Sequence, residues 1–251
     1  MTALEPFTSG ARRVAVPDPA APDGWRIDPE ARAVILSAFA DRSTQEWAVG
    51  PFRFRDRVGL PAHPLEDPSV RVVPGGTSVR AGAHLEPGVV IMPPSFVNVG
   101  AWIGEGTMVD SAVLVGSCAQ VGARVHLAAG VVIGGVLEPP GARPVIVEDD
   151  VFVGAGASLL EGVLVRAGAV IGAGVVLTGT SRLYDLVGAR ELVGSFEAPL
   201  VVPAGAVVVP GVRAVAGSFA ESRGLGLATA LLVKYRDPGT DARVALEGAL
   251  R

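Results

Sequence analysis

Aliphatic residues recur at every sixth position through the middle of the chain. Stepping in sixes from Val73 lands on valine, isoleucine or leucine eleven times in succession, as far as Ile133. The period resumes for six steps from Val147 and for two more at Val202 and Val208. A helix repeats every 3.6 residues and a simple strand every two, so a period of six fits neither. It predicts short strands joined by tight turns, three to a coil of about 18 residues, with the coils stacked in parallel.

The residues around each aliphatic position support this interpretation. We expect the aliphatic side chain to point into the coil, and the small or β-branched residue four places later, such as Ala101 or Thr107, to lie near a corner. The residue directly after the aliphatic is often Gly or Ala, as at Gly104, Gly116 and Gly122. Because glycine tolerates positive φ, we expect these glycines to relieve the turns. The predicted fold class is therefore mainly β, a parallel β-helix built from hexapeptide repeats.

Two segments interrupt the repeat, residues 138–144 and 182–200. Segments of this kind leave a regular scaffold as surface loops and often carry contacts to a substrate or partner. We therefore expect one β-helix domain over residues 71–217 with two inserted loops.

The flanks of the repeat have a different pattern. Asp28 and Pro29 have the character of a helix N-cap and first-turn proline, and the apolar residues that follow predict a short amphipathic helix. Residues 1–25 show no periodicity and are expected to be irregular, so residues 1–70 form a short N-terminal helical and irregular segment. Residues 218–251 are expected to cap the other end of the stack.

This C-terminal cap is expected to contain one strand and one helix. The strand-like run is Ala228–Tyr235, and Thr240 with Asp241 would cap a helix that reaches Leu250.

Composition narrows the class of protein. Hydrophobic residues make up 49% of the chain and charged residues 18%, which disfavours disorder, while aromatic residues reach only 5% and indicate a thin aliphatic interior. The net charge is −4, Lys234 is the only lysine, and no basic block suggests nucleic acid. Cys118 is the single cysteine, and neither a signal peptide nor a membrane span is evident. A cytoplasmic protein without nucleic-acid or membrane partners is expected.

The residues that break the repeat carry the functional information. The segments are, in order, Arg71-Val-Val-Pro74, Met92-Pro-Pro-Ser-Phe-Val-Asn98, Gly104-Glu-Gly-Thr-Met-Val-Asp110, Gly116-Ser-Cys-Ala-Gln120, Val125-His-Leu127, Gly134-Gly-Val-Leu-Glu-Pro139 and Leu160-Glu-Gly162. Together they closely resemble the tetrahydrodipicolinate N-succinyltransferase family, from about Ala31 to the C-terminus, although that family often has a longer N-terminal helical domain. The resemblance implies left-handed coiling, against the usual crossover preference.

The resemblance also implies a reaction and its residues. Succinyl-CoA would donate its acyl group to the amine of the ring-opened substrate, 2-amino-6-oxopimelate, in the diaminopimelate route to lysine. Arg71 and Asp110 match the family's substrate-binding arginine and aspartate, and Glu161 matches the acidic residue near the amine. We expect Arg71 to bind a substrate carboxylate, and Asp110 and Glu161 to hold the amine and take its proton.

The binding site for CoA is less sharply defined. The resemblance implies a homotrimer that binds CoA in a groove between subunits, with no permanently bound cofactor and no metal. Candidates for contact with CoA are two Gly-Ala corners and one cation, namely Gly154, Ala155, Gly172, Ala173 and Lys234. Cys118 and His126 are interpreted as packing residues rather than as a nucleophile or a base.

Three alternatives compete with this interpretation. A zinc carbonic anhydrase needs three histidines that converge on the metal. His84 and His126 occupy the same position in their hexads but lie on different faces of the coil, so they do not converge within one chain. A non-catalytic solenoid would have no reason to interrupt its repeat twice. An N-acetyltransferase acting on the same acceptor is the closest rival, and residues 116–120 and the long loop from Ser181 favour the succinyl enzyme.

Overall fold

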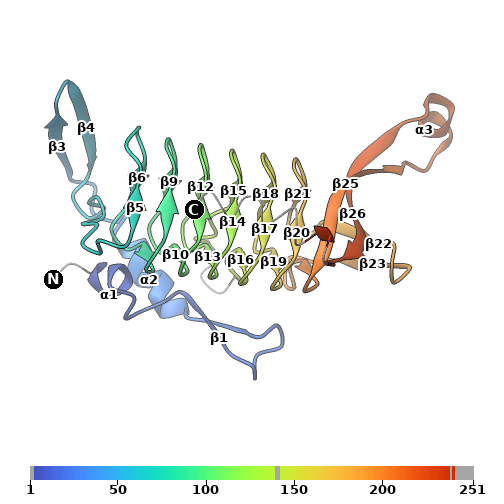
Figure 1. Ribbon diagram of the computed structural model, residues 1–251, viewed down its shortest axis with the longest axis horizontal. Coiled ribbons are helices and arrows are strands. Elements are labelled where there is room, and N and C mark those ends of the chain that lie inside the picture. The colour runs from blue at the N-terminus through green and yellow to red at the C-terminus, as the bar shows by residue number, and fades with distance from the viewer. Residues whose placement is uncertain (1–2, 139–141, 238, 241–251) are drawn as a thin grey trace.

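A computed structural model describes residues 3–138, 142–237 and 239–240. The centre of the molecule is a parallel β-helix in which short strands form three faces, and successive coils stack along one long axis (Figure 1). Each coil visits the faces in the same order, which we name sheet 1, sheet 2 and sheet 3. The predicted hexapeptide β-helix is confirmed.

Most of these strands are two residues long, and the turns between them form the corners. Sheet 1 contains β5 (Arg71–Val72), β8 (Val90–Ile91), β11 (Met108–Val109), β14 (His126–Leu127), β17 (Phe152–Val153), β20 (Val170–Ile171) and β25 (Ala206–Ala214). Sheet 2 contains β6 (Ser78–Val79), β9 (Phe96–Val97), β12 (Leu114–Val115), β15 (Val132–Ile133), β18 (Ser158–Leu159) and β21 (Val176–Leu177). Sheet 3 contains β7 (His84–Leu85), β10 (Trp102–Ile103), β13 (Gln120–Val121), β16 (Ile146–Val147), β19 (Leu164–Val165) and β24 (Val201–Val202). We number the coils from coil 1 (β5, β6, β7) to coil 6 (β20, β21, β24), and β25 begins the next turn.

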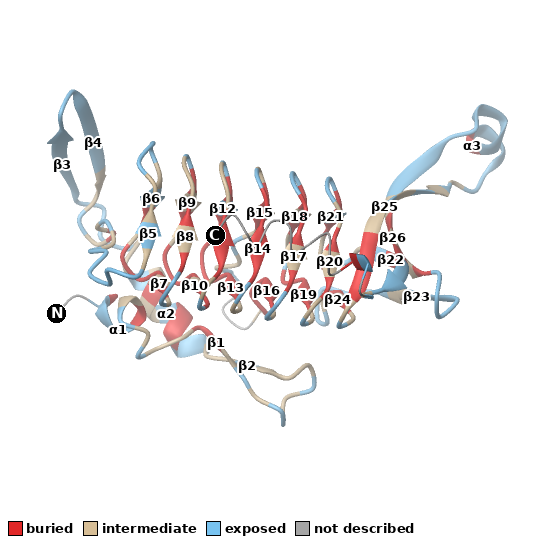
Figure 2. Ribbon diagram, viewed as in Figure 1, coloured by how far each residue is buried: buried red, intermediate tan, exposed pale blue. Residues whose placement is uncertain are grey.

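The interior is a single aliphatic column. The second residue of each two-residue strand points inward and is fully buried from Ile91 onward, whereas Val72 in coil 1 is half-buried. The inside of the β-helix is therefore buried from coil 2 onward, while most of both arms is exposed (Figure 2). The residue four places later, expected near a corner, is buried as well, as at Ala101 and Thr107. Thr107 lies there because its hydroxyl donates to Gly122 O at 2.8 Å and accepts from Val125 N at 3.0 Å.

The first coil departs from the predicted register. Val72, and not Val73, pairs with Ile91 and packs against the column. Coil 1 therefore holds one residue more than the repeat, and the additional residue is accommodated by the turn that contains Gly75 and Gly76, at φ 142° and 96°. Glycine adopts both φ angles without strain, whereas a residue with a side chain would be strained there.

The glycines that follow the inward aliphatics have a different role from the one expected. Positive φ occurs two residues further along, for example at Gly106 and Gly130, while Gly104 does not adopt it. A Cβ on Gly104 would lie 2.6 Å from Ala123 N in the next coil. Close stacking of the backbones, rather than the turn itself, requires these glycines.

The N-terminal segment covers sheet 3 and is more regular than expected. It contains α1 (Glu5–Thr8), the antiparallel pair β1 (Ala15–Pro17) and β2 (Trp25–Ile27), and α2 (Pro29–Ser37). The predicted N-cap is confirmed, since Asp28 Oδ1 accepts from Ala31 N at 2.9 Å. The prediction of irregular structure over residues 1–25 is wrong for α1, β1 and β2, because the apolar residues that order them, Leu4, Phe7 and Ala15, are buried against the β-helix.

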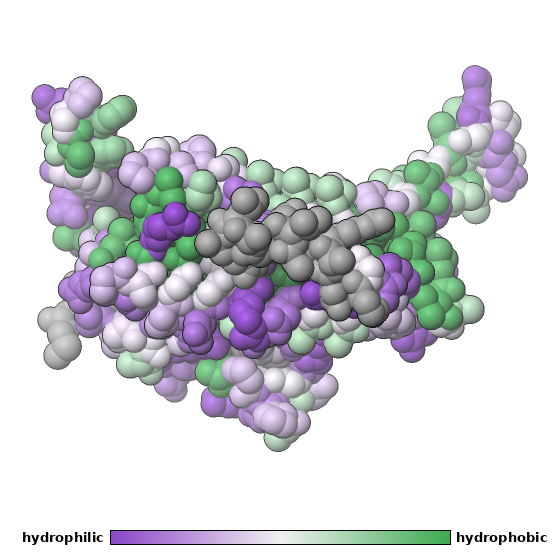
Figure 3. All heavy atoms as spheres, viewed as in Figure 1, coloured by the Kyte–Doolittle hydropathy of each residue, from purple (hydrophilic) through white to green (hydrophobic). Residues whose placement is uncertain are grey.

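An arm extends from each end of the β-helix, and both arms project to the same side (Figure 1). The N-terminal arm is the hairpin of β3 (Thr44–Val49) and β4 (Phe52–Arg57). The C-terminal arm consists of β25, α3 (Ser218–Arg223) and β26 (Gly226–Tyr235), so the strand predicted near this end is confirmed. The space-filling view shows hydrophobic residues where β25 and β26 meet the β-helix (Figure 3). The helix predicted from residue 240 to 250 lies outside the described residues. No helix of the described chain is long and apolar enough to cross a membrane.

Candidate active site

Both interruptions of the repeat leave the β-helix at the same corner, between sheet 2 and sheet 3. The first connects β15 to β16 in coil 4, and the second connects β21 to β24 in coil 6. The second contains a hairpin of β22 (Arg182–Asp185) and β23 (Arg190–Val193). Coil 5 lies between these coils, and its residue at this corner is Glu161. The fold therefore places Glu161 between the two inserted loops.

A pocket of about 350 Å³ opens at this corner. Glu161 is exposed and lines it, together with residues contributed by the first loop and by the second. The lining residues are Gly135, Val136, Leu137, Glu138, Ala142, Glu161, Gly179, Thr180, Ser195, Phe196 and Pro199. Apolar walls around a few polar groups and a carboxylate are typical of a small-molecule site.

Glu161 has an unusual backbone. Its φ is 53° and that of Gly162 is 75°, so two successive residues lie in the left-handed region. A non-glycine residue costs about 1–2 kcal/mol in this conformation, and surrounding contacts have to hold it there. A Cβ on Gly179 in the next coil would lie 2.5 Å from the carbonyl oxygen of Glu161, so glycine is needed for the coil-6 backbone to pass this corner.

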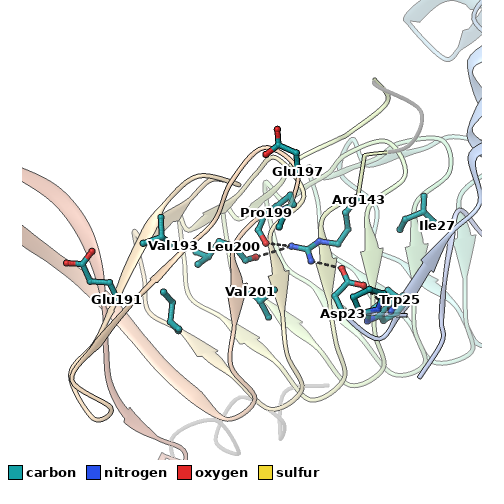
Figure 4. Close-up of a pocket in the computed structure, with 13 residues that line it drawn as sticks. Asp23, Trp25, Ile27, Arg143, Glu191, Val193, Glu197, Pro199, Leu200 and Val201 are labelled. Atoms are coloured by element: carbon teal, nitrogen blue, oxygen red, sulfur yellow. Dashed lines mark hydrogen bonds and ion pairs between the residues drawn. The ribbon is translucent and has the colours of Figure 1, made fainter. Parts of the chain in front are cut away.

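A second, larger pocket lies behind the wall formed by Pro199 and has a volume of about 750 Å³ (Figure 4). The side chain of Arg143, only 8% exposed, extends across it and forms an ion pair with Asp23, 2.7 Å from Nη1 to Oδ2. Burial lowers the pKa of Arg143, and Asp23 partly offsets this effect. The sequence predicts only a loop for residues 138–144, and the one signal for Arg143 there is an arginine directly before a proline.

Asp110 lies at a different corner, between sheet 1 and sheet 2 in coil 3. Its half-buried side chain accepts from Ser111 N at 2.6 Å through Oδ1, and its carbonyl accepts from Ser95 Oγ at 2.9 Å. The second contact anchors the backbone at this corner, while one carboxylate oxygen caps the turn. The other oxygen, Oδ2, has no hydrogen bond to the described residues.

Arg71 is exposed at the start of β5 in coil 1, on the outer face of sheet 1. Arg71 and Asp110 are separated by two coils, or about 10 Å along the stack at about 4.8 Å per coil, and Asp110 and Glu161 belong to different corners. The described chain by itself does not bring the three predicted residues together.

The two Gly-Ala pairs predicted to contact CoA lie on the same corner as Asp110. Gly154-Ala155 is in coil 5, and Gly172-Ala173 is directly next to it in coil 6. A Cβ on Gly154 would lie 2.5 Å from Ala173 N, so stacking alone requires this glycine. Lys234, on β26, forms an ion pair with Asp237 at 2.7 Å and is half exposed.

The two residues set aside as packing residues are both buried. Cys118 packs beneath α2, and burial raises the pKa of its thiol to about 11. His126 stacks on Phe152 with ring centroids 5.1 Å apart, and it lies on sheet 1 whereas His84 lies on sheet 3. The described residues hold no group of three or more side chains suited to a metal ion.

Comparison with known proteins defines the class. Residues 144–179 match the family described as the hexapeptide repeat of succinyl-transferase, so the chain is a left-handed parallel β-helix of the hexapeptide-repeat transferases. It is 42% identical to the 2,3,4,5-tetrahydropyridine-2,6-dicarboxylate N-succinyltransferase of Pseudoalteromonas translucida, over 99% of this chain and 86% of that protein. The chain belongs to the 2,3,4,5-tetrahydropyridine-2,6-dicarboxylate N-succinyltransferase family.

Two further comparisons agree. The Rhodospirillum rubrum protein of the same name is 50% identical over 72% of this chain and 61% of its own length. A crystal structure from Campylobacter jejuni, assigned as a 2,3,4,5-tetrahydropyridine-2-carboxylate N-succinyltransferase, superposes with a TM-score of 0.51 at 17% identity. It covers 92% of this chain and 61% of that chain, and it supports the fold.

Proposed function

We propose that this protein transfers the succinyl group of succinyl-CoA to the amine of ring-opened tetrahydrodipicolinate, 2-amino-6-oxopimelate, in lysine and diaminopimelate biosynthesis. The observation that carries the proposal, beyond family membership, is the position of Glu161. Its exposed carboxylate lies in a pocket between the two inserted loops, both of which leave the repeat at the corner between sheet 2 and sheet 3.

The chemistry needs a neutral amine, because an ammonium ion has no lone pair with which to attack the thioester. The amine nitrogen bonds to the thioester carbonyl carbon, the C–S bond breaks, and CoA leaves as the thiolate, which is then protonated. The proton lost by nitrogen goes to a carboxylate, the role we assign to Glu161 with Asp110 as its partner in holding the amine. The guanidinium of Arg71 pairs with a carboxylate of the acceptor.

We propose that the site is completed between neighbouring subunits of a homotrimer. Asp110 and Glu161 lie on different corners of one β-helix, so a second copy has to supply one of them. Exposed apolar side chains at both arms support such an assembly, among them Phe52 at 66% exposed and Phe219 at 69%. The extended CoA arm would then follow the Gly154-Ala155 and Gly172-Ala173 corner, with Lys234 near its phosphates. The free cysteine is consistent with a reducing compartment, the cytoplasm.

The test follows the release of free thiol in the presence of the acceptor and either succinyl-CoA or acetyl-CoA. We expect turnover with succinyl-CoA and little with acetyl-CoA. Turnover with acetyl-CoA but not with succinyl-CoA would overturn the assigned donor. No turnover with either donor would overturn the proposed transferase activity.

The role of Glu161 is tested in the same assay. Glu161→Gln should lower kcat by about 10²–10⁴-fold, the range for loss of a general base. The control is Glu105→Gln, because Glu105 is an exposed carboxylate at the corner between sheet 3 and sheet 1. Full turnover by Glu161→Gln would remove Glu161 from the chemistry.

A further inference from the structure

The buried guanidinium of Arg143 joins three parts of the chain that surround Glu161. Its Nε donates to Gly162 O at 2.8 Å, and Nη2 donates to Pro199 O at 2.6 Å and to Leu200 O at 3.2 Å. Arg143 itself follows Ala142, the last residue of the first loop that lines the Glu161 pocket. One side chain thus connects the first loop, the coil-5 corner and the returning end of the second loop.

Arg143 lies behind the pocket wall and not in the pocket. Pro199 lines both the Glu161 pocket and the larger one, whereas Arg143 lines only the larger pocket (Figure 4). Its contacts with the site go to backbone carbonyls, so it has no direct route to the substrate. A role in the reaction would have to act through the geometry of Glu161.

The geometry of Glu161 needs such support. Glu161 and Gly162 are both in the left-handed conformation, and the carbonyl of Gly162 is held by Arg143. On the other side of the guanidinium, Asp23 from the turn between β1 and β2 supplies the compensating charge. Four of the five N–H groups of the guanidinium thus have acceptors, which is the arrangement that makes a buried arginine tolerable.

We infer that Arg143 is a positioning residue that fixes the carboxylate of Glu161 for proton transfer by holding the coil-5 corner and the second loop in one arrangement. The inference rests on the proposed function. It also gives the N-terminal segment a part in the reaction, because Asp23 neutralises the charge on which the arrangement depends. Lysine cannot replace Arg143, because an ammonium group is a point charge without the planar fork that reaches acceptors in three directions.

The experiment compares Arg143→Lys with a matched control, Arg124→Lys. Arg124 forms ion pairs with Asp149 and Asp150 at another corner of the same β-helix, remote from the pocket. We expect Arg143→Lys to lower kcat by about 10- to 100-fold, since a displacement of about 1 Å costs this much. The KM for succinyl-CoA and the rate of the Arg124→Lys variant should stay near those of the parent protein.

A double-mutant cycle separates positioning from a general structural role. In the Glu161→Gln background, Arg143→Lys should change the residual rate by less than about twofold, because the group it positions is already gone. An equal loss in both backgrounds, or no loss in either, would overturn the inference. If the parent protein releases no thiol from either donor, the proposed function fails and this inference fails with it.

A second variant covers the case in which Arg143→Lys does not fold. Arg143→Gln combined with Asp23→Asn replaces the ion pair by two neutral amides and leaves no uncompensated charge. Circular dichroism and size-exclusion chromatography verify the fold. The same cycle with Glu161→Gln should then give the same non-additive loss, and additive losses would overturn the inference.

Discussion

The guanidinium carbon of Arg13 lies 4.3 Å from the ring centroid of Trp102, which projects from the outer face of sheet 3. The ring of Trp25 lies on the same guanidinium at 5.3 Å, and Arg13 Nε donates to Gln120 Oε1 at 2.7 Å. Gln120 is fully buried and donates in turn to the carbonyls of the corner at Cys118 and Ala119. Arg13 therefore attaches the N-terminal segment to the β-helix.

Loss of this attachment should loosen the N-terminal segment. We expect Arg13→Met to lower the free energy of unfolding by about 1–3 kcal/mol, because the cation–π contacts are lost and a buried amide oxygen loses its charged donor. Urea denaturation followed by tryptophan fluorescence measures the change. Arg26→Met is the control, since Arg26 is 63% exposed and pairs with Asp18 at 3.4 Å. A similar loss in both variants would contradict the assigned role of Arg13.

Cys118 should be inert in the native protein. Its side chain is fully buried and its pKa is raised to about 11, so alkylation by iodoacetamide at pH 8 should occur only after unfolding. Mass spectrometry of native and unfolded protein tests this. Cys118→Ala should retain full turnover, and a large loss of kcat would contradict a packing role.

The same thiol predicts a pH dependence of stability. Burial holds the pKa of the thiol at about 11 in the folded state, above the ordinary cysteine value of 9.0 that applies in the unfolded chain. Its contribution is therefore complete below pH 9 and is lost as the pH rises from 9 through 11, because the unfolded chain releases its proton first. Cys118→Ala should decline less steeply over this interval, as followed by urea midpoints. If the stability of the parent protein and of Cys118→Ala declined equally over this interval, the thiol would not contribute to the pH dependence.

Two glycines at the same corner should differ in their tolerance of a side chain. A Cβ on Gly154 would meet Ala173 N at 2.5 Å, so Gly154→Ala has to separate two coils, at a cost of about 2–3 kcal/mol. Gly174 has open space around it, and with φ at 70° the cost of Gly174→Ala is only about 1 kcal/mol. Urea midpoints of the two variants should rank in this order, and the reverse order would contradict the stacking argument.

Mixing of inactive subunits tests the shared site. Asp110→Asn and Glu161→Gln should each keep only a small residual rate alone, and unfolding and refolding them together should restore part of the activity. Activity returns because some interfaces then combine an intact Asp110 from one copy with an intact Glu161 from another. Refolding each variant alone is the control. No recovery in a correctly assembled mixture would contradict a site that combines Asp110 of one subunit with Glu161 of another.

The sequence predicts the β-helix in detail because each hexad is a local pattern with one inward aliphatic. It does not predict the shift at Val72, which arises because an additional residue enters the Gly75-Gly76 turn without any change in hydrophobicity. The sequence also does not predict the regular structure of the N-terminal segment. Leu4, Phe7 and Ala15 have no periodic pattern of their own and are ordered by surfaces of the β-helix far away in sequence.

The candidate site is predictable only in part. Glu161 and Asp110 are found by resemblance, whereas their placement on different corners of one β-helix comes from the structure. The ion pair between Arg143 and Asp23 cannot be found in this way, because it joins a loop to a turn 120 residues away. The hexapeptide period relates residues within the coils only, so it does not predict contacts between two irregular segments.

Both insertions lie at one corner, and the strand register of the β-helix does not depend on how many residues are inserted there. Residues added between sheet 2 and sheet 3 leave the β-helix and return to the next inward position, so the aliphatic column continues unchanged from β15 to β16 and from β21 to β24. The scaffold and the pocket can therefore diverge separately during evolution. A change in the length of either loop should therefore leave the aliphatic column and the strand register of the β-helix intact.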